Sequence, residues 1–501
     1  MTVPAFSRRP GEFIDVCLIV EGCYPHVSGG VSTWVDWLIR SCPDLRFGVR
    51  SLVPLGEDRR SRYPIPVNLV DFQEIVLAQS RDDDSSRPRR GSISCDSLAP
   101  ILIEFLECGT LNALTQLDHA INNPQNPVPL RQLVSGPYSW SLCVATYEAI
   151  MPHASFKDFF WAWHALMGGL FSVMKTELPA AAAYHTISTG YAGLLAARAT
   201  ISGATNVILT EHGIYTNERR IEILMADWIV DTIDKGLGIA DPRRDLRDLW
   251  IAVFESYARI CYAACSHVTT LFADNQPMQR MLGAEETRLE IIPNGIDLDR
   301  FGAIPECPPD HPPTVALIGR IVPIKDIKTF LMAAAAIRDR VRNVRIVIAG
   351  SSDENPSYAE ECFALAQELD LGSTVEFVGQ VDVKDLLATT HVVVLTSLSE
   401  AQPLTVLEAG AAGRPCVTTD VGACREILEG PPGEEGGYIA ELLAADQVAD
   451  HVVRLLNDRE LRQRCGDNLR RKVRRHYASA DAAARYRALY GVPSAQSRKL
   501  G

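Results

Sequence analysis

No apolar run in the chain is long enough to cross a membrane. Among its 501 residues, the most apolar segments, Val344–Gly350 and His391–Ser397, have only the length of a strand, whereas a spanning helix needs about 20 apolar residues. The segment before Phe13 also lacks the apolar core of a secretory signal. These absences argue against a membrane-spanning or exported chain and predict a cytoplasmic protein.

Paired cysteines are missing as well. None of the 13 cysteines stands in a CxxC pair, the spacing that is typical of redox and zinc sites. Several of them lie inside apolar runs. We therefore interpret the cysteines as small core residues in a reducing compartment, and we predict that the protein holds no metal.

The chain has no excess of positive charge. Against 49 lysines and arginines stand 62 aspartates and glutamates, which gives a formal net charge of −13. This balance argues against a nucleic-acid partner, but not against a small anionic ligand, because a pyrophosphate needs only local positive charge and backbone N–H groups. The basic stretch Arg462–His476 is either a solvated helix face or a weak contact with a membrane surface or an acidic partner.

What the sequence does contain is a repeated alternation of strand-like and helical segments. The first strand, Phe13–Glu21, is followed by a glycine-rich loop and by the helical pattern Val31–Arg40. Further strands are expected at Ala181–Thr186, Asn206–Thr210, His267–Ala273, Thr314–Gly319, Val344–Gly350, Val375–Val378, Val392–Thr396 and Pro415–Thr418. This alternation predicts an α/β fold with parallel sheets, in which ligands bind at the carboxyl ends of the strands.

A proline-rich break divides the alternation into two series. Five prolines lie between Pro305 and Pro313, and such a segment continues neither a helix nor a central strand. We predict an N-terminal Rossmann-like domain (1–305), a C-terminal one (314–475), and a helix and tail (476–501) that pack back on the first domain. A helical insertion at about residues 55–145 is expected to interrupt the first domain. The two domains are expected to face one another across a cleft.

Two glutamates stand around the start of a predicted helix. The strand ending at Ser397 is followed by a loop that holds Glu400, by Pro403 at the expected first helical position, and by Glu408 one to two turns further on. The N–H groups of the helix start suit phosphate or developing negative charge. The carboxylates suit sugar hydroxyls, because an ionised carboxylate only accepts hydrogen bonds.

Two basic residues follow another strand of the same domain. Arg320 and Lys325 lie in the loop after Thr314–Gly319. A guanidinium can grip a phosphate through its fork, and an ammonium binds as a point charge. On the first domain, Gly29 and Gly30 follow the first strand, where glycines let the backbone approach a ligand closely.

Together these motifs resemble those of the retaining GT-B glycosyltransferases of family four. The spacing from Glu400 to Glu408 matches that family's E-x7-E signature, and Arg320 with Lys325 matches its phosphate-binding pair. Further matches are Pro293–Asp297 (PNGID) and Phe377–Val381 (FVGQV). The resemblance implies a GT-B fold of two facing Rossmann-like domains, a nucleotide-diphosphate sugar as donor, and transfer with retention at the anomeric carbon.

The resemblance also implies a role for each matched residue. Arg320 and Lys325 neutralise the departing pyrophosphate, so that neither a metal ion nor another cofactor is required. Glu400 binds the hydroxyls of the donor sugar, and Glu408 those of the ribose. The other implied donor contacts are Gln402, Pro403, Leu404 and Thr405 at the helix start, Gly29 and Gly30 over the phosphates, and Gln380 and Val381 at the base.

Histidine and aspartate residues at strand ends are the remaining candidates. His212 matches the family's histidine near the reacting sugar, although a histidine at a strand end can also be a neutral structural residue. His185 and Asp274 are weaker candidates of the same kind. Ala401 departs from the family, because many relatives carry glycine after the first glutamate; alanine does not take a positive φ as easily, so the loop and the donor sugar can differ.

A closer resemblance concerns the first domain. Leu18–Val35 and Thr210–Tyr215 are similar to the cytosolic transferases of Pel exopolysaccharide synthesis. This implies a UDP-sugar donor, a growing polysaccharide as acceptor, and inner-membrane Pel synthase subunits as partners. Two other hypotheses stay open: a UDP-sugar epimerase, which the paired motifs fit poorly, and a nucleotide-sugar-binding subunit that regulates a membrane polysaccharide synthase without turnover.

Overall fold

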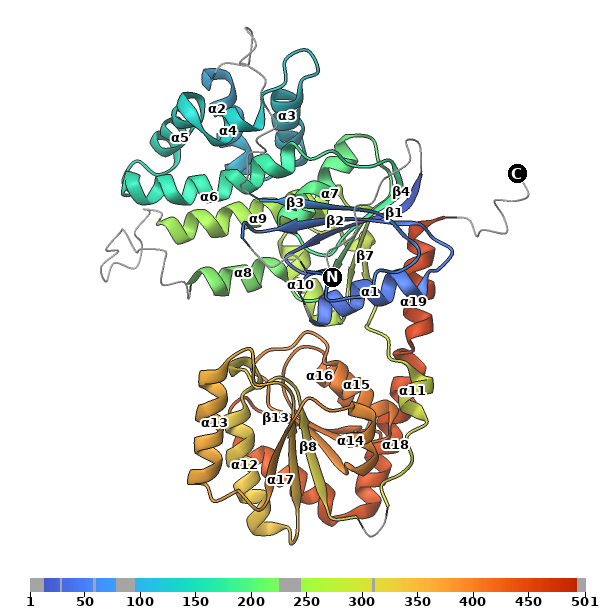
Figure 1. Cartoon of the computed structure of the whole chain (residues 1–501). Helices are drawn as coiled ribbons and strands as arrows, with labels where there is room; N and C mark the ends of the chain where they lie inside the picture. Colours follow the sequence, from blue (N-terminus) through green and yellow to red (C-terminus); the bar gives the residue numbers. More distant parts are fainter. Residues whose placement is uncertain are drawn as a thin grey trace, which may run out of the picture. The chain divides into compact units, whose positions relative to one another are not determined.

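The computed structural model describes residues 13–27, 29–56, 60–77, 95–224, 245–308 and 311–492. They form two compact units (Figure 1). The first comprises Met1–Thr270, Asn275–Glu290 and Arg485–Gly501, and the second comprises Leu271–Asp274 and Ile291–Ala484.

The first unit is built on a seven-stranded sheet of order β3-β2-β1-β4-β5-β6-β7. Its strands are β1 (Ile14–Glu21), β2 (Phe47–Val53), β3 (Leu69–Val76), β4 (Ala181–Thr186), β5 (Val207–Glu211), β6 (His267–Thr270) and β7 (Leu289–Ile291). The pairs from β3 to β6 are parallel. β1 and β2 are buried almost throughout, as is typical of inner strands in a parallel sheet that is covered on both faces. The strand order reverses between β1 and β4, which marks the ligand-binding edge of such a sheet.

Helices cover this sheet and extend beyond it. They are α1 (Gly30–Ser41), α2 (Cys95–Cys108), α3 (Leu111–Asn122), α4 (Leu130–Val134), α5 (Gly136–Ile150), α6 (Phe156–Met174), α7 (Tyr191–Ile201), α8 (Tyr215–Leu224), α9 (Leu246–Ala264) and α10 (Gln276–Met281). Helices α2–α6 lie together in Figure 1, on one side of the unit. They share one hydrophobic core with α7 and α9.

The start of the predicted insertion at residue 55 is wrong, because β3 is a strand of the sheet. It is an edge strand with several half-buried side chains, so its sequence lacks the continuous apolar run that marks the inner strands. The helical stretch begins with α2 in the described residues and continues through α6 to Met174.

The second unit has a six-stranded parallel sheet of order β10-β9-β8-β11-β12-β13. Its strands are β8 (Thr314–Ile318), β9 (Arg345–Ala349), β10 (Val375–Gly379), β11 (Val392–Leu395), β12 (Cys416–Thr419) and β13 (Gly437–Ala440). Its helices are α11 (Leu298–Gly302), α12 (Ile327–Arg340), α13 (Pro356–Glu368), α14 (Val383–Thr389), α15 (Leu404–Ala411), α16 (Cys424–Leu428), α17 (Ala445–Asn457) and α18 (Arg459–His476). The strand order reverses between β8 and β11, so the ligand-binding edge lies where these two strands end.

The boundary between the units lies earlier than the prolines. Residues Ile291–Ala484 belong to the second unit, which corrects the predicted end of the first domain at residue 305. The reason is packing, because Phe301 and Ile304 share a hydrophobic core with Val406 and Leu407 of α15. Prolines end helices and strands, but they do not by themselves separate cores.

The last helix, α19 (Ser479–Tyr490), contributes to both units. Its end packs in the first unit, where Tyr486 and Tyr490 are buried and the side-chain amide of Asn206 donates to the Leu489 carbonyl at 3.0 Å. Across the described residues, no helix is both long and apolar enough to span a membrane. The predicted α/β class with two Rossmann-like sheets is confirmed.

Candidate functional site

The loops after β8 and β11 are joined to each other at the carboxyl edge of the second unit's sheet. The Thr396 hydroxyl donates to the Asp326 carbonyl at 2.9 Å, and the Leu398 N–H donates to the Ile324 carbonyl at 2.8 Å. These bonds bring together two side chains that are 75 residues apart in the chain, and the Lys325 ammonium forms an ion pair with the Glu400 carboxylate. Both side chains are mostly buried, which protects the pair from solvent screening.

The same carboxylate is held from a second side. The Ser397 hydroxyl donates to Glu400 Oε1 at 2.6 Å. Asp326, the residue after Lys325, has a left-handed backbone with φ of 44° and caps α12 through its carboxylate, which accepts from the Thr329 N–H at 3.3 Å. Aspartate tolerates this conformation better than most residues. The turn at Asp326 thus fixes where the lysine leaves the backbone.

Arg320 is not joined to this pair. Its side chain is about half exposed and forms an ion pair with Glu354, which is equally exposed. An exposed pair of this kind contributes little to stability, so releasing the guanidinium to another anion costs little. The structure therefore places Arg320 at the same strand end as Lys325 but directs it to a surface partner.

The start of α15 lies beside the lysine–glutamate pair. Pro403 precedes the first helical residue, Leu404, instead of occupying the first position as expected, and the Thr405 hydroxyl donates to the Ile318 carbonyl at 3.3 Å. Gln402 is buried, and its Oε1 accepts from the Asn294 N–H at 2.6 Å, while its Nε2 has no partner in the described part of the chain. The predicted residues 402–405 thus form a bonded turn that opens the helix.

Glu408 stands on the second turn of α15. Burial raises the pKa of its carboxyl to about 7, although nearby Arg300 opposes the rise. No hydrogen bond or ion pair to this carboxylate occurs among the described residues. A half-buried acceptor without a protein partner is suited to a ligand that carries hydroxyl donors.

A glycine of a neighbouring loop, Gly422, packs directly against the backbone of Glu400 and Ala401. Gly422 has φ of +51°, and a Cβ there would lie 2.2 Å from the carbonyl oxygens of both Glu400 and Ala401. The next residue, Ala423, donates its N–H to the Ala401 carbonyl at 2.8 Å. Ala401 itself does not have a positive φ. Replacing the family's glycine by Ala401 therefore costs no backbone strain here, and the glycine that the loop needs is Gly422.

Gln380 and Val381 follow β10 at the same edge of the sheet, and both are exposed. Gly379 before them has φ of +66° and accepts at its carbonyl from the Gly350 N–H at 2.8 Å. A Cβ on Gly350 would overlap the Gly319 carbonyl oxygen at 1.9 Å. Glycines thus allow neighbouring strand ends to approach closely, and the side chain of Gln380 beside them is exposed to solvent.

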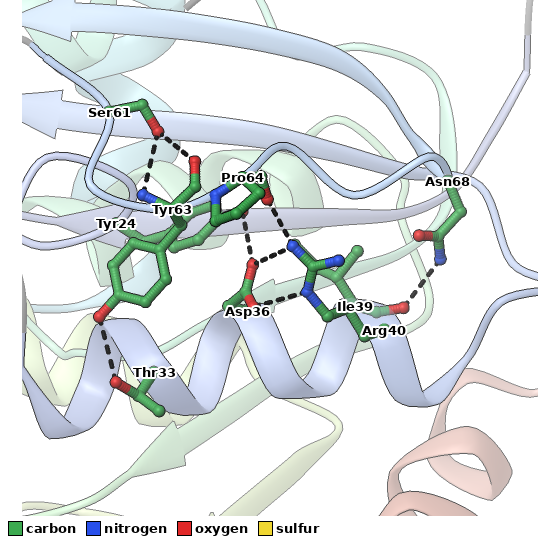
Figure 2. Close-up of polar contacts among 9 residues, drawn as sticks. All are labelled: Tyr24, Thr33, Asp36, Ile39, Arg40, Ser61, Tyr63, Pro64 and Asn68. Carbon is green, nitrogen blue, oxygen red and sulfur yellow. Dashed lines mark hydrogen bonds and ion pairs between the residues drawn. The ribbon is translucent and has the colours of Figure 1, made fainter. Parts of the chain in front are cut away.

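In the first unit, Gly29 and Gly30 are exposed at the start of α1, and a Cβ on either would meet nothing within 4 Å. Figure 2 shows the segment that covers this turn, in which the Tyr63 hydroxyl lies 3.1 Å from the Thr33 hydroxyl. The Gly29 N–H points to the same tyrosine oxygen at 3.5 Å. No side chain of the helix itself caps α1.

The segment around Tyr63 is anchored further along α1 (Figure 2). Arg40 bonds to Asp36 at 2.7 Å and also donates to the Pro64 carbonyl. The side-chain amide of Asn68 donates to the Ile39 carbonyl at 2.8 Å near the end of the helix. These contacts fix Tyr63 over the first turn of α1.

His212 lies after β5 in the first unit, and both of its ring nitrogens are buried without a hydrogen-bond partner among the described residues. Its ring meets the edge of Trp34, with centroids 4.7 Å apart. Burial lowers the pKa of His212 to about 4, so the imidazole is neutral near pH 7. A buried imidazole with two unpartnered nitrogens is suited to a polar ligand.

The two weaker candidates differ from His212. His185 has both nitrogens bonded, one to the Tyr490 hydroxyl at 2.9 Å and one to the Thr210 hydroxyl at 2.8 Å. It is fully buried, and burial together with His212 lowers its pKa to about 3, so it serves as a structural residue. Asp274 is exposed, lies in a short 3₁₀ turn (Ala273–Asn275) and belongs to the second unit.

A polar network at the ends of β1 and β5 was not predicted. Glu21 accepts from the Tyr215 hydroxyl at 2.7 Å and from the Ala192 N–H at the start of α7 at 3.0 Å. The Arg219 guanidinium donates to the same tyrosine oxygen at 2.9 Å. A carboxylate that ends an apolar strand at the expected ligand edge is the signal that could have indicated it.

Comparisons with known proteins bear on both units. Residues 14–287 match a family described as a domain of unknown function, DUF3492. Residues 306–472 match the family described as glycosyl transferases group 1. The chain belongs to the DUF3492 family. Its second unit is a group 1 glycosyltransferase domain.

Curated relatives of this DUF3492 protein are glycosyltransferases. The chain is 29% identical over 168 residues to N-acetyl-alpha-D-glucosaminyl L-malate synthase of Bacillus anthracis, covering 33% of this chain and 42% of that protein. It is 26% identical over 302 residues to the GDP-mannose-dependent alpha-(1-6)-phosphatidylinositol monomannoside mannosyltransferase of Mycobacterium tuberculosis, covering 56% and 69%. The chain spans less than half the length of the first of these relatives, and 57% of the length of a further relative, an alpha-1,3-N-acetylgalactosaminyltransferase of Campylobacter jejuni.

Solved structures share the fold of the whole chain. Sucrose-phosphate synthase from Thermosynechococcus elongatus has a TM-score of 0.56 at 18% identity, covering 95% of this chain and 98% of its own. HepE of Anabaena, solved in complex with UDP, has a TM-score of 0.59 at 12% identity, covering 96% and 100%. The DUF3492 protein therefore has the predicted GT-B fold.

Proposed function

We propose that the protein is a retaining, metal-independent glycosyltransferase that takes its sugar from a nucleotide-diphosphate donor. The observation that carries this proposal is the buried Lys325–Glu400 ion pair at the strand-order reversal of the second unit. An ammonium for phosphate and a carboxylate for sugar hydroxyls are thereby held at one point. The group 1 glycosyltransferase domain over residues 306–472 supports the same conclusion.

In this proposal the two cations stabilise the departing nucleotide. Lys325 exchanges Glu400 for a phosphate oxygen when the donor binds, and Arg320 leaves its exposed partner Glu354 for the same pyrophosphate. Fixed positive charge at a developing anion lowers the barrier most effectively where water is excluded. Because two protein cations supply this charge, no metal ion is needed for the step.

The remaining residues of the second unit hold the donor in place. Glu400 accepts from hydroxyls of the donor sugar, and Glu408 accepts from those of the ribose. Backbone N–H groups at the opening of α15, residues 402–405, meet the sugar and the phosphates, where the helix dipole favours negative charge. Gln380 and Val381, exposed at the end of β10, receive the base.

In the first unit, three residues are assigned to substrate. The exposed Gly29 and Gly30 leave the backbone at the start of α1 open to the phosphates. His212 offers its two unpartnered ring nitrogens to the reacting sugar. Its neutral form suits a hydrogen bond to a hydroxyl rather than an ionic contact.

We propose a UDP-sugar as donor and a polysaccharide as acceptor. HepE, which shares the fold, is solved with UDP and with UDP-glucose, and the segments Leu18–Val35 and Thr210–Tyr215 resemble PelF, the Pel exopolysaccharide transferase. On that basis the chain extends Pel on the cytoplasmic side, beside inner-membrane synthase subunits.

The proposal is tested by nucleotide release from UDP-, GDP- and ADP-sugars in EDTA, with wild type, Glu408→Ala and Lys325→Ala. Release from a UDP-sugar that both variants lose is the expected result. NMR of the product is expected to show the same anomeric configuration as the donor. Tight UDP binding without release from any donor, even with purified acceptor, would instead identify a regulatory subunit.

A further inference from the structure

A second polar site lies at the opposite edge of the same sheet. A pocket of about 120 Å³ opens beside the residues that precede β11 and β12, namely His391 and Pro415. These are the amino ends of the strands, whereas Lys325 and Glu400 follow the carboxyl ends. Nothing in the proposed glycosyl transfer uses this edge.

Four arginines line the pocket: Arg414, Arg459, Arg462 and Arg470. Arg414 is 5% exposed, and its guanidinium donates to the carbonyls of Leu387 and Pro305. In the described part of the chain no carboxylate forms an ion pair with it. A buried cation whose protein partners are only carbonyls is incompletely compensated.

The guanidinium of Arg462, which is half-buried, likewise donates only to backbone carbonyls over the ranges that the structure describes. Its Nη1 donates to the carbonyls of Leu455 and Leu456, both at 2.9 Å, near the end of α17. Arg462, too, has no carboxylate partner within the described ranges. The carbonyls at a helix end carry only a partial negative charge, so they offset a fraction of the guanidinium charge.

Arg470 is partly compensated by Asp467, whose carboxylate lies 3.5 Å from its Nη1. Its Nε is buried and has no hydrogen-bond partner among the residues that the structure describes. Burial lowers the pKa of Arg414 below its ordinary value; Arg470 acts in the same direction, and Cys307 and Glu306 oppose it. Burial and Arg459 act in the same direction on the pKa of Arg462. The arginines therefore repel one another across the pocket.

We propose that this pocket binds a compact oxyanion, a phosphoryl group or a sulfate, through the guanidinium groups of Arg414, Arg459 and Arg462. Arginine presents N–H donors in a fork that matches the oxygens of phosphate. The pocket volume of about 120 Å³ is several times the share of one water molecule in the liquid, about 30 Å³. It therefore has room for one such group.

A metal ion is the competing ligand. Cys307, His311 and His391 place one ligand atom each within 4.8 Å of one another beside the pocket. However, His391 Nδ1, which lies 3.8 Å from the Cys307 sulfur, already accepts from the Thr314 N–H at 3.1 Å. The four guanidinium groups around the site also outnumber the two carboxylates in its lining, those of Glu306 and Asp467, and so repel a cation. The charge of the pocket thus favours an anion.

Cys307 lines the pocket and supplies a probe of its occupancy. We would measure the rate at which a neutral maleimide labels Cys307 in the full chain, by mass spectrometry of its peptide, at increasing inorganic phosphate. Chloride at matched ionic strength is the solution control, and exposed Cys108 of the first unit is the internal control. Bound phosphate slows labelling by the factor 1 + [phosphate]/Kd, about tenfold at ten times Kd.

Two variants locate the anion. Arg462→Gln retains a donor for the α17 carbonyls. Arg459→Gln changes an exposed residue, so it should leave the fold intact. In each variant we expect the Kd for phosphate, measured by the protection of Cys307, to rise by at least about tenfold. Lys325→Ala is expected to leave the protection unchanged, because that residue lies at the other edge. Glycerol phosphate, tested in parallel, shows whether a phosphate monoester is bound as well as the free ion.

Three results would overturn the proposal. In the first, phosphate does not slow the labelling of Cys307. In the second, Lys325→Ala loses the protection by phosphate, while both arginine variants keep it. In the third, zinc slows the labelling and phosphate has no effect.

Discussion

Glu408 is expected to cost stability in exchange for substrate binding, and the cost depends on pH. Its carboxyl has a pKa of about 7 in the folded protein against an ordinary value of 4.5, because the side chain is largely withdrawn from water. The folded state therefore keeps a proton that the unfolded state releases between these values. Stability falls as the pH rises from 4.5 to about 7, and the loss is complete above that range.

The magnitude follows from the two pKa values. A difference between 4.5 and about 7, at about 1.4 kcal/mol per pH unit, sets an upper limit of about 3.5 kcal/mol on the cost at pH 8. Glu408→Gln removes the charge at every pH. We expect this variant to be more stable than wild type by up to this amount at pH 8, and to be equal to it at pH 4.5.

The assay is urea unfolding of wild type and variant at pH 4.5 and pH 8, followed by far-UV circular dichroism. All seven tryptophans precede the second unit in the sequence, so tryptophan fluorescence provides a control transition that the substitution should leave unchanged. The reasoning is refuted if the variant is less stable at pH 8, or if the difference between the proteins is the same at both pH values. UDP binding should weaken by about tenfold or more in the same variant, because a charge-assisted acceptor is lost.

Three further substitutions test the supports of the site. Gly422→Ala places a methyl group 2.2 Å from the carbonyl oxygen of Glu400. Displacement of that loop should reduce kcat/KM by about a hundredfold in a nucleotide-release assay, and unchanged kinetics would contradict this role of Gly422. Gln402→Met removes the acceptor of the buried Asn294 N–H and should cost about 1–3 kcal/mol in urea unfolding followed by circular dichroism, whereas an unshifted midpoint would argue against that bond. Tyr63→Phe removes one exposed hydroxyl over α1, so a loss above about 1 kcal/mol in fluorescence-detected unfolding would count against the geometry.

Most of the strands that were predicted from local sequence patterns lie within one or two residues of their observed bounds. The strand at Ala181–Thr186 has the predicted bounds, and the helix predicted at Val31–Arg40 is one residue longer at each end, because a continuous apolar run or a helical periodicity is a property of neighbouring residues. The helix that carries Glu408 was likewise located by its proline and by the strand before it. In contrast, β3 is half buried at a sheet edge, and its pattern is weak for that reason.

The contacts that shape the site could not be read from the sequence. Lys325 and Glu400 were both singled out, but their ion pair depends on the order of β8 and β11 in the sheet. Gly422 supports the Glu400 loop from 22 residues further along the chain, and only the fold shows why it must be glycine. The bonding of both His185 nitrogens, one of them to Tyr490, likewise appears only once α19 is packed.

The PNGID motif was recognisable in the sequence, but its contacts appear only in the structure. Its resemblance to a family pattern was evident, but its work in this chain is structural. Gly295 lies so close to Ser479 that a Cβ would approach its Cα at 2.3 Å, and Ile296 pairs with the backbone around Ala478. Asp297 caps α11 by accepting from the Arg300 N–H at 2.9 Å. The motif fixes the start of the second unit to the start of α19.

We propose that a protein cation, and not a metal ion, stabilises the departing nucleotide. The most direct test compares nucleotide release by wild type, Lys325→Ala and Lys328→Ala in EDTA, with Lys328 as a nearby control lysine that pairs with Glu361 on the surface. We predict that wild type and Lys328→Ala turn over at similar rates, while Lys325→Ala loses about a hundredfold or more in kcat. Release that requires a divalent cation, or that survives in Lys325→Ala, would contradict the account.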